Sequence, residues 1–303
     1  MQRWQAQFLL LAAIWGSSFL FIKVLGEHWS AVWVAFGRIA LGALTLLALV
    51  YLRHERLPRD RRVWMHSAVI AALFCSVPWT LFAYGEQHTS SIVAGLWNAT
   101  TPLWVLALTL AGFGDERATA TRTTGLGMGF IGVALLLGPW RGLGGGQLIG
   151  HLACGAAAFC YAVGFHYTRR HLAWRAESGV VLSACQLTCA TLILAPFLLL
   201  APVPTTLRLE DVGSLLALGA LSSGVAFALN YAIVRARGAT VASTVTYVIP
   251  VVSTALGAAV LGEQLHWNQP AGTLVLLLGI AISQGRVTFR RLPARAGPEQ
   301  VGS

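Results

Sequence analysis

The sequence is poor in charge. Charged residues make up 11% of its 303 residues, hydrophobic residues make up 56%, and the mean hydropathy is +0.68. A water-soluble domain carries about 25% charged residues. Too little polar surface is left to cover a soluble fold, so the composition predicts a membrane protein. It also excludes nucleic-acid binding through a soluble basic domain, although the net charge is +10.

The sequence also lacks the motifs of enzymes and metal sites. It contains no HExxH, no GxSxG and no pair of membrane aspartates, and no P-loop Lys-Ser/Thr follows the glycine-rich stretch 142–146. The five cysteines lie in apolar runs without a metal-ligand spacing to histidine. We therefore expect no enzyme activity, no metal and no cofactor, and we interpret 142–146 as a flexible linker.

What the sequence does contain is ten apolar segments. A crossing needs about 20 residues, and each segment is long enough or nearly so. We interpret the first segment as a retained helix, because nine others follow it and no convincing cleavage site ends it. The predicted segments are 5–25, 32–52, 64–85, 91–113, 123–139, 147–168, 178–200, 212–234, 239–261 and 270–286.

The basic residues predict an orientation in the membrane. With a cytoplasmic N-terminus, seventeen of the 21 Lys and Arg residues fall in inside loops or the C-terminal segment, and only Arg141 and Arg208 fall in outside loops. This asymmetry follows the positive-inside rule. It predicts a multi-pass protein of a bacterial-type inner membrane, with both termini in the cytoplasm.

The two halves of the chain repeat one pattern. An apolar run with Pro102 ends at Gly114-Asp115, and a similar run with Pro250 ends at Gly262-Glu263, with an offset of 148 residues. Five spans per half is an odd number, so the second half enters the membrane in the opposite orientation. We therefore predict an all-α membrane protein of ten transmembrane helices in two inverted five-helix repeats, 5–139 and 147–286, followed by a cytoplasmic tail, 287–303.

These features resemble the drug/metabolite transporter superfamily, in its ten-helix EamA-type branch. The resemblance spans residues 5 to 286 and rests on Ile14-Trp15-Gly16-Ser17-Ser18, on the two proline stretches, and on the glycines of the last helix in each half. Within the branch the chain is similar to YddG-type amino-acid exporters, on the evidence of Trp15, Asn98 and Tyr247. It carries Thr101 and Phe159 where such exporters tend to carry tryptophan. The resemblance implies alternating-access export.

The two prolines predict polar backbone groups near the membrane midplane. Each proline frees the carbonyl four residues before it, which is that of Asn98 for Pro102 and that of Thr246 for Pro250. In hydrocarbon a freed carbonyl must face protein, water or substrate. One interpretation is a polar collar around a central cavity. The other is a helix kink satisfied by Ser and Thr hydroxyls for packing alone.

Polar and aromatic residues inside the spans are the candidates for substrate binding. A buried Trp or Tyr needs a partner for its N–H or O–H, which a wet cavity provides, although packing is the alternative for each one. Arg38 lies about two turns into the second segment, where it either binds a substrate anion or snorkels to the surface. The predicted substrate-binding residues are Trp15, Ser17, Arg38, Trp79, Tyr84, Trp97, Asn98, Thr101, Tyr161, Asn230, Thr244 and Tyr247, with Pro102 and Pro250 as helix kinks.

No Asp or Glu falls near the middle of any predicted span. This absence favours uniport or exchange over proton-coupled transport, because a membrane carboxyl is the usual proton carrier. The sequence thus predicts a monomeric secondary transporter that exports amino acids or similar small metabolites. Its expected partners are the small-molecule substrate and the lipid bilayer. Export or flipping of other metabolites, drugs or lipid-linked substrates is the alternative.

Overall fold

The computed structural model describes residues 3–113, 119–138, 140, 145–172, 177–237 and 245–283. Over these residues all regular structure is helical. Eight helical stretches are long and apolar enough to cross a membrane, and two shorter apolar helices, Val248–Val260 and Asn268–Ile282, bring the total to ten. The prediction of an all-α, ten-span membrane protein is confirmed.

Each span of the first half has its counterpart about 148 residues later. In the first half the elements are α1 (Arg3–Gly26), α2 (Ala31–Leu52), α3 (Arg61–Ala71), η1 (Ala72–Ser76), α4 (Val77–His88), α5 (Ser91–Asn98), α6 (Thr101–Leu108), η2 (Thr109–Phe113) and α7 (Ala120–Leu137). In the second half they are α8 (Gly145–His171), α9 (Gly179–Leu194), η4 (Ala195–Leu199), α10 (Leu209–Leu216), η5 (Ala217–Val225), α11 (Ala226–Arg237), α13 (Val245–Val260) and α14 (Asn268–Ser283).

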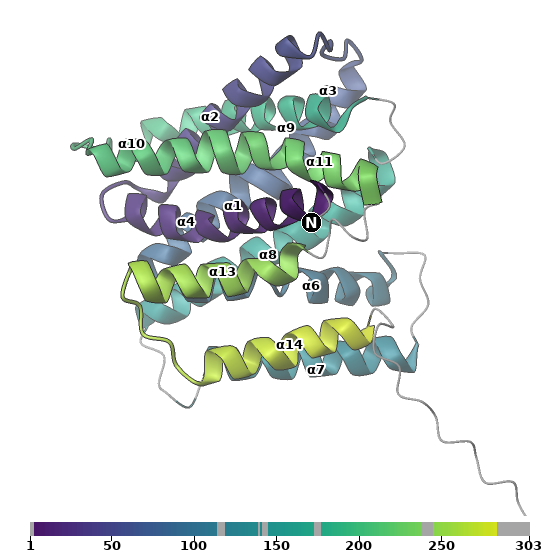
Figure 1. Ribbon diagram of the computed structural model, residues 1–303, viewed down its shortest axis with the longest axis vertical. Coiled ribbons are helices and arrows are strands. Elements are labelled where there is room, and N and C mark those ends of the chain that lie inside the picture. Colours follow the sequence, from purple (N-terminus) through teal and green to yellow (C-terminus); the bar gives the residue numbers. More distant parts are fainter. Residues whose placement is uncertain are drawn as a thin grey trace, which may run out of the picture.

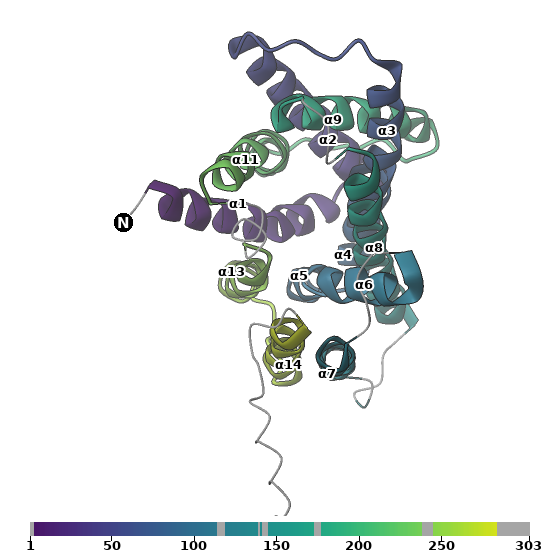
Figure 2. The ribbon, with the colours of Figure 1, turned by 90° about the vertical axis from the view of Figure 1, so that its right-hand side faces the viewer.

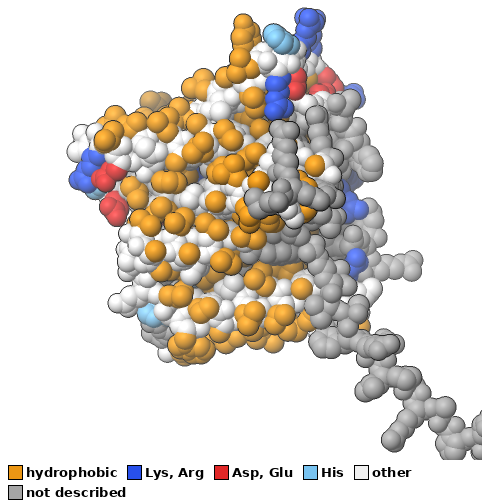
Figure 3. Space-filling view, viewed as in Figure 1, with side chains coloured by type: hydrophobic (Ala, Val, Ile, Leu, Met, Phe, Trp, Pro, Cys, Tyr) orange, Lys and Arg blue, Asp and Glu red, His pale blue; other side chains and the backbone are white. Residues whose placement is uncertain are grey.

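The helices run side by side as one bundle (Figure 1). The face seen in Figure 3 is covered by hydrophobic side chains between the two ends of the helices, and its charged side chains lie at the edges. A face of this composition suits lipid. We call the end where α1 finishes the Lys23 end, and the end where α2 finishes the Arg53 end.

The helices of the two halves pack extensively on one another. The second helices of the repeats, α2 and α9, pack on each other, and so do the last helices, α7 and α14. α1 packs on α13 of the other half, and its counterpart α8 packs on α5 and α6. These reciprocal contacts are those of two inverted repeats around a pseudo-two-fold axis. Figure 2 shows α7 beside α14, and α13 between α14 and α1.

Glycines let α7 and α14 approach backbone to backbone. A β-carbon on Gly132 would lie 2.5 Å from the Leu276 nitrogen and 2.8 Å from the Gly272 oxygen. A β-carbon on Gly272 would in turn lie 2.7 Å from the Gly132 oxygen. Gly279 meets Gly125 and Gly129 in the same way. Small residues are favoured at membrane helix crossings because packing, and not the hydrophobic effect, holds such helices together.

Three spans depart from regular α-helix near the contact between the halves. The third helix of each repeat carries a π-helical segment at equivalent positions, η1 and η5. The fourth helix of the first repeat is broken, because α5 ends at Asn98 and α6 begins at Thr101, just before Pro102. Pro250 lies inside α13. π-helical turns are rare and occur frequently at functional sites.

We predict that Gly132→Ala destabilises the protein and that Gly127→Ala does not. Both glycines lie on α7, but a β-carbon on Gly127 would meet nothing within 4 Å. Overpacking the crossing should cost about 1–3 kcal/mol. Thermal unfolding of the purified protein in detergent measures the difference. Equal melting temperatures for the two variants would contradict the close packing of α7 on α14.

Candidate functional site

Arg38 is a buried cation held by serine hydroxyls and an aromatic ring. It lies on α2, and 9% of the residue is exposed. Its Nε donates to the Ser223 hydroxyl at 3.1 Å, and its Nη2 donates to the Ser222 hydroxyl at 3.2 Å. Among the described residues, no acidic side chain comes within ion-pairing distance of it. Serine hydroxyls orient the guanidinium, but they do not neutralise its charge.

The two serines come from η5 of the other half. Ser223 donates its own hydroxyl to the Leu218 carbonyl at 3.0 Å, which leaves its lone pairs for Arg38. The Ser222 hydroxyl lies 2.7 Å from that of Ser18 on α1. The Ser222 carbonyl accepts the indole N–H of Trp15 at 3.2 Å. The π-helical turn therefore links α1 and α2 of the first half to the second half.

Aromatic rings close the other side of Arg38. The guanidinium carbon lies 3.9 Å from the centre of a Trp79 ring, a cation–π contact. Tyr161 of α8 interacts with both Arg38 and Trp79, and its ring packs on Phe74 and Phe82. We call Trp15, Ser18, Arg38, Trp79, Tyr161, Ser222 and Ser223 the central cluster. It draws on α1, α2, α4 and α8 around η5.

The central cluster has a partial counterpart across the pseudo-two-fold axis. Gln186 on α9 is the repeat equivalent of Arg38, and Cys75 in η1 is the repeat equivalent of Ser223. Gln186 Nε2 lies 3.1 Å from Cys75 Sγ. The same contact between a second helix and the opposite π-helical turn is thus made twice. Only one of the two copies carries a charge.

Four of the residues predicted from the sequence meet in the central cluster: Trp15, Arg38, Trp79 and Tyr161. Trp97 is buried between α5 and α8, in one apolar cluster with Trp15 and Tyr161, but among the described residues it has no polar contact with the central cluster. Its indole N–H donates to His151 Nδ1 at 3.0 Å, and Gly155 lies against its ring. The indole therefore has a protein partner without any cavity.

The carbonyl freed by Pro102 also has a protein partner. The Thr101 hydroxyl donates to the Asn98 carbonyl at 2.8 Å, and the Thr100 hydroxyl donates to the Trp97 carbonyl at 2.7 Å. At the break between α5 and α6, threonine hydroxyls therefore satisfy the free carbonyls, as expected for a helix kink that serves packing alone. Asn98 itself is half-buried.

The remaining predicted residues make other contacts or lie outside the described residues. The Ser17 hydroxyl donates to the Ile14 carbonyl of its own helix at 3.0 Å. Tyr84 is exposed, and its ring lies 4.5 Å from that of His88. Asn230 is half-buried on α11. Thr244 and the side chain of Tyr247 lie outside the described residues.

Sequence reasoning missed three serines of the central cluster as site residues: Ser18, Ser222 and Ser223. Ser18 follows a Trp-Gly-Ser motif, and the other two lie between Gly219 and Gly224. Paired hydroxyls beside glycine in an apolar run are a usable signal. The π-helical turn that aims them at Arg38 carries no comparable mark in the sequence.

Polar contacts gather at the Lys23 end, and those of Glu263 join the two halves. The Glu263 carboxylate accepts hydrogen bonds from the backbone N–H of Ser91 at 2.7 Å, from its hydroxyl at 2.9 Å and from the N–H of Ile92 at 3.0 Å. A carboxylate at a helix N-terminus accepts hydrogen bonds from the free N–H groups of the helix. Its negative charge is also attracted to the positive end of the helix dipole. Lys23 Nζ donates to the carbonyls of Glu86 and Thr89.

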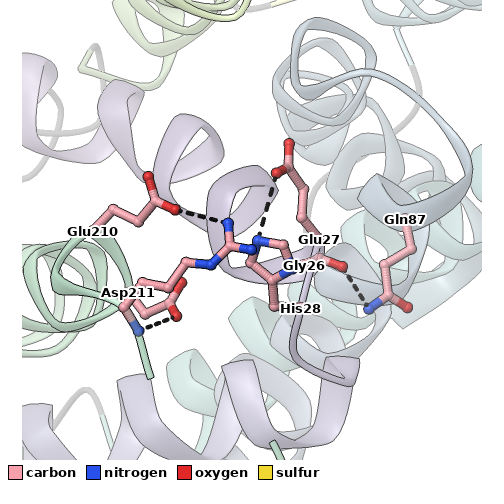
Figure 4. A network of polar contacts seen from close by, with 7 residues as sticks. Gly26, Glu27, His28, Gln87, Glu210 and Asp211 are labelled. Atoms are coloured by element: carbon pink, nitrogen blue, oxygen red, sulfur yellow. Dashed lines mark hydrogen bonds and ion pairs between the residues drawn. The ribbon is translucent and has the colours of Figure 1, made fainter. Parts of the chain in front are cut away.

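Further polar groups cover this end (Figure 4). Gln87 donates to the Gly26 carbonyl at 3.4 Å and to the Trp29 carbonyl at 2.9 Å. From the second half, Arg208 pairs with Glu210 at 3.2 Å, and the Asp211 carboxylate caps the Arg208 N–H. In contrast, a groove of about 340 Å³ lies at the Arg53 end. The residues that line it are Arg53, Ser178, Gly179, Val180, Ala228, Ala232 and Ala236.

The chain matches known transporters along its length. The sequence profile of the EamA-like transporter family matches twice, at residues 2–138 and 148–284. An uncharacterised transporter of Archaeoglobus fulgidus is 28% identical over 90% of this chain and 95% of its own. The uncharacterised inner membrane transporter YedA of Escherichia coli is 27% identical over 94% of this chain and 92% of its own.

A crystal structure with the same fold is also known. It covers 94% of this chain and 98% of its own, with a TM-score of 0.65 and 21% sequence identity. At this identity the likeness concerns the fold alone.

We predict that Glu263→Gln loosens the start of α5. Glutamine keeps one acceptor oxygen but loses the charge that favours the helix N-terminus, a change of roughly 1 kcal/mol. Hydrogen–deuterium exchange of peptides covering 89–96 should become faster. Glu210→Gln is the control, because that carboxylate is exposed and pairs only with Arg208 among the described residues. Unchanged exchange in Glu263→Gln would show that the contact does not hold α5.

Proposed function

Because the chain belongs to the EamA-like transporter family, we propose that it exports amino acids or similar small metabolites by alternating access between its two halves. The observation that carries this proposal is Arg38, a buried cation at the contact between the halves with no acidic partner among the described residues. A buried charge is unfavourable unless it is paired. A substrate carboxylate supplies the missing partner.

The guanidinium has donors to spare. Of its five N–H groups, two are engaged by Ser222 and Ser223. The others can donate to a carboxylate, and charge-assisted bonds of this kind are about twice as strong as neutral ones. Trp79 and Tyr161 add flat apolar surface beside the charge. Together they suit a small molecule with one carboxylate and an apolar or zwitterionic body.

The two ends of the helices differ. Hydrogen bonds close the Lys23 end, whereas the Arg53 end carries the groove. We place the Arg53 end in the cytoplasm, because the basic loops gather there in the sequence. The relative named as an inner membrane transporter supports the same membrane for this chain. An exporter in this state would load substrate from the cytoplasm.

The proposed transport is uniport or exchange, because no Asp or Glu lies near the middle of a span. Uptake of a radiolabelled amino-acid panel into liposomes that hold the purified protein tests it, with and without a pH gradient. Uptake of neutral amino acids without a gradient supports the proposal. Uptake only under a pH gradient would overturn uniport or exchange in favour of proton-coupled transport. No uptake in either condition would favour other metabolites or lipid-linked substrates.

We expect Arg38→Gln to lower this uptake at least tenfold. The variant removes the charge that pairs with the substrate, and a hydrogen bond to a charged group contributes about 1.5–3 kcal/mol. Arg38→Lys keeps the charge without the planar fork, so it should retain intermediate activity. Arg208→Gln removes an exposed cation and is the matched control. Equal activity of Arg38→Gln and Arg208→Gln would remove Arg38 from the site.

Trp97→Ala and Asn98→Ala are also expected to impair transport while expression holds. Both residues border the break in the fourth helix, whose geometry sets how α6 leaves α5. Trp97→Phe separates two roles, because phenylalanine fills much of the space but cannot donate to His151. Normal uptake in the two alanine variants would exclude the break from the transport pathway.

A further inference from the structure

Glu86 carries a buried carboxyl with no hydrogen-bond partner among the described residues. It lies in the last turn of α4, and 1% of the residue is exposed. In the described parts of the chain, neither of its carboxyl oxygens has a donor. The equivalent position in the second half carries Val234, so nothing in the repeated architecture demands an acid here. Buried polar groups are nearly always hydrogen-bonded, and one without a partner calls for an explanation.

Charged and titratable groups from four directions act on Glu86. They are Lys23 on α1, Arg38 on α2, Cys154 on α8 and Glu263 after α13. Lys23 contacts Glu86 directly, but its ammonium group donates to the backbone carbonyls of Glu86 and Thr89, at 2.5 and 2.8 Å, and not to the carboxyl. The cation that could neutralise Glu86 is held by other acceptors.

Glu86 and Glu263, two acidic residues at the Lys23 end, differ in the hydrogen bonds that their carboxyl groups accept. The Glu263 carboxylate accepts three hydrogen bonds, whereas the Glu86 carboxyl accepts none from the described residues. An ionised carboxylate is stabilised by donors and is strongly disfavoured without them in a medium of low polarity. Two neighbouring carboxylates also repel each other, so one proton is best placed on the acid that lacks donors.

We propose that Glu86 is a proton-binding site that holds a proton while the Lys23 end is closed and releases it when that end opens to water. Opening separates Glu263 from α5 and frees Lys23 from its carbonyl acceptors. Water and the ammonium group can then stabilise the ionised carboxylate. The proton leaves to, and returns from, the solution at the Lys23 end. The pH on that side therefore sets how readily this end closes.

The same proton affects the central cluster. Arg38 and Glu86 act on each other electrostatically. In the proposed function, an ionised Glu86 would reduce the positive potential that attracts a substrate carboxylate to Arg38, whereas a neutral Glu86 would not. Proton binding and carboxylate binding then favour each other, and such coupling is reciprocal.

The direct test is infrared spectroscopy of the full chain in lipid bilayers, which detects the carbonyl stretch of a protonated carboxylic acid. The wild type minus Glu86→Gln difference spectrum at neutral pH should contain this band. Glu27→Gln, which removes an exposed carboxyl at the same end, should leave the band unchanged. A difference spectrum without the band would overturn the proposal. Reversible loss of the band at high pH in the wild type alone gives the same answer if Glu86→Gln does not fold.

Hydrogen–deuterium exchange tests the link to opening. In the wild type, peptides covering 86–98 should exchange faster, beyond the intrinsic effect of pH, as Glu86 loses its proton. In Glu86→Gln they should stay protected over the same range, because glutamine cannot ionise. Glu86→Asp should restore a pH dependence. If the wild type and Glu86→Gln respond identically to pH, Glu86 does not control the closure.

Discussion

The structure depends on one constraint, that a backbone polar group inside the membrane must find its partner within the protein. Regular helix meets it almost everywhere, and the exceptions are concentrated where the halves meet. The Asn98 carbonyl accepts a hydrogen bond from the Thr101 hydroxyl, and the Ser222 carbonyl accepts one from the Trp15 indole N–H. These two departures from regular helix thus draw side chains toward them. One of them, at Ser222, lies in the central cluster.

The two repeats give the protein a symmetric backbone arrangement, and residues that differ between equivalent positions make the binding site asymmetric. The second helix of each repeat contacts the π-helical turn of the other, through Arg38 and Ser223 on one side and Gln186 and Cys75 on the other. A charge on one side only makes the two sides of the interface electrostatically unequal. A monocarboxylate can therefore bind in one orientation without meeting a second cation. Glu86, opposite Val234 in the repeat, is a second such departure from symmetry.

The sequence predicts the fold well because hydropathy and the 148-residue offset depend on composition and spacing alone. It predicts the site in part. Arg38 and Trp79 are conspicuous as a charge and a large ring within apolar runs. Ser222 was missed, because its role depends on a π-helical turn that is set by packing and not by local propensity. The polar partner of Trp97 could not be read from the sequence, because His151 lies 54 residues away along the chain.

An end that must both close and open cannot be held by a large apolar contact. At the Lys23 end Glu263 binds backbone N–H groups, and Gly257 lets α13 come close to Ser91 and Ile92. The N–H groups at a helix N-terminus have no partners within their own helix, so water can replace the carboxylate when the halves separate. Opening then exchanges protein hydrogen bonds for water, at a modest net cost. The contact is specific enough to define the closed state and weak enough to be reversible.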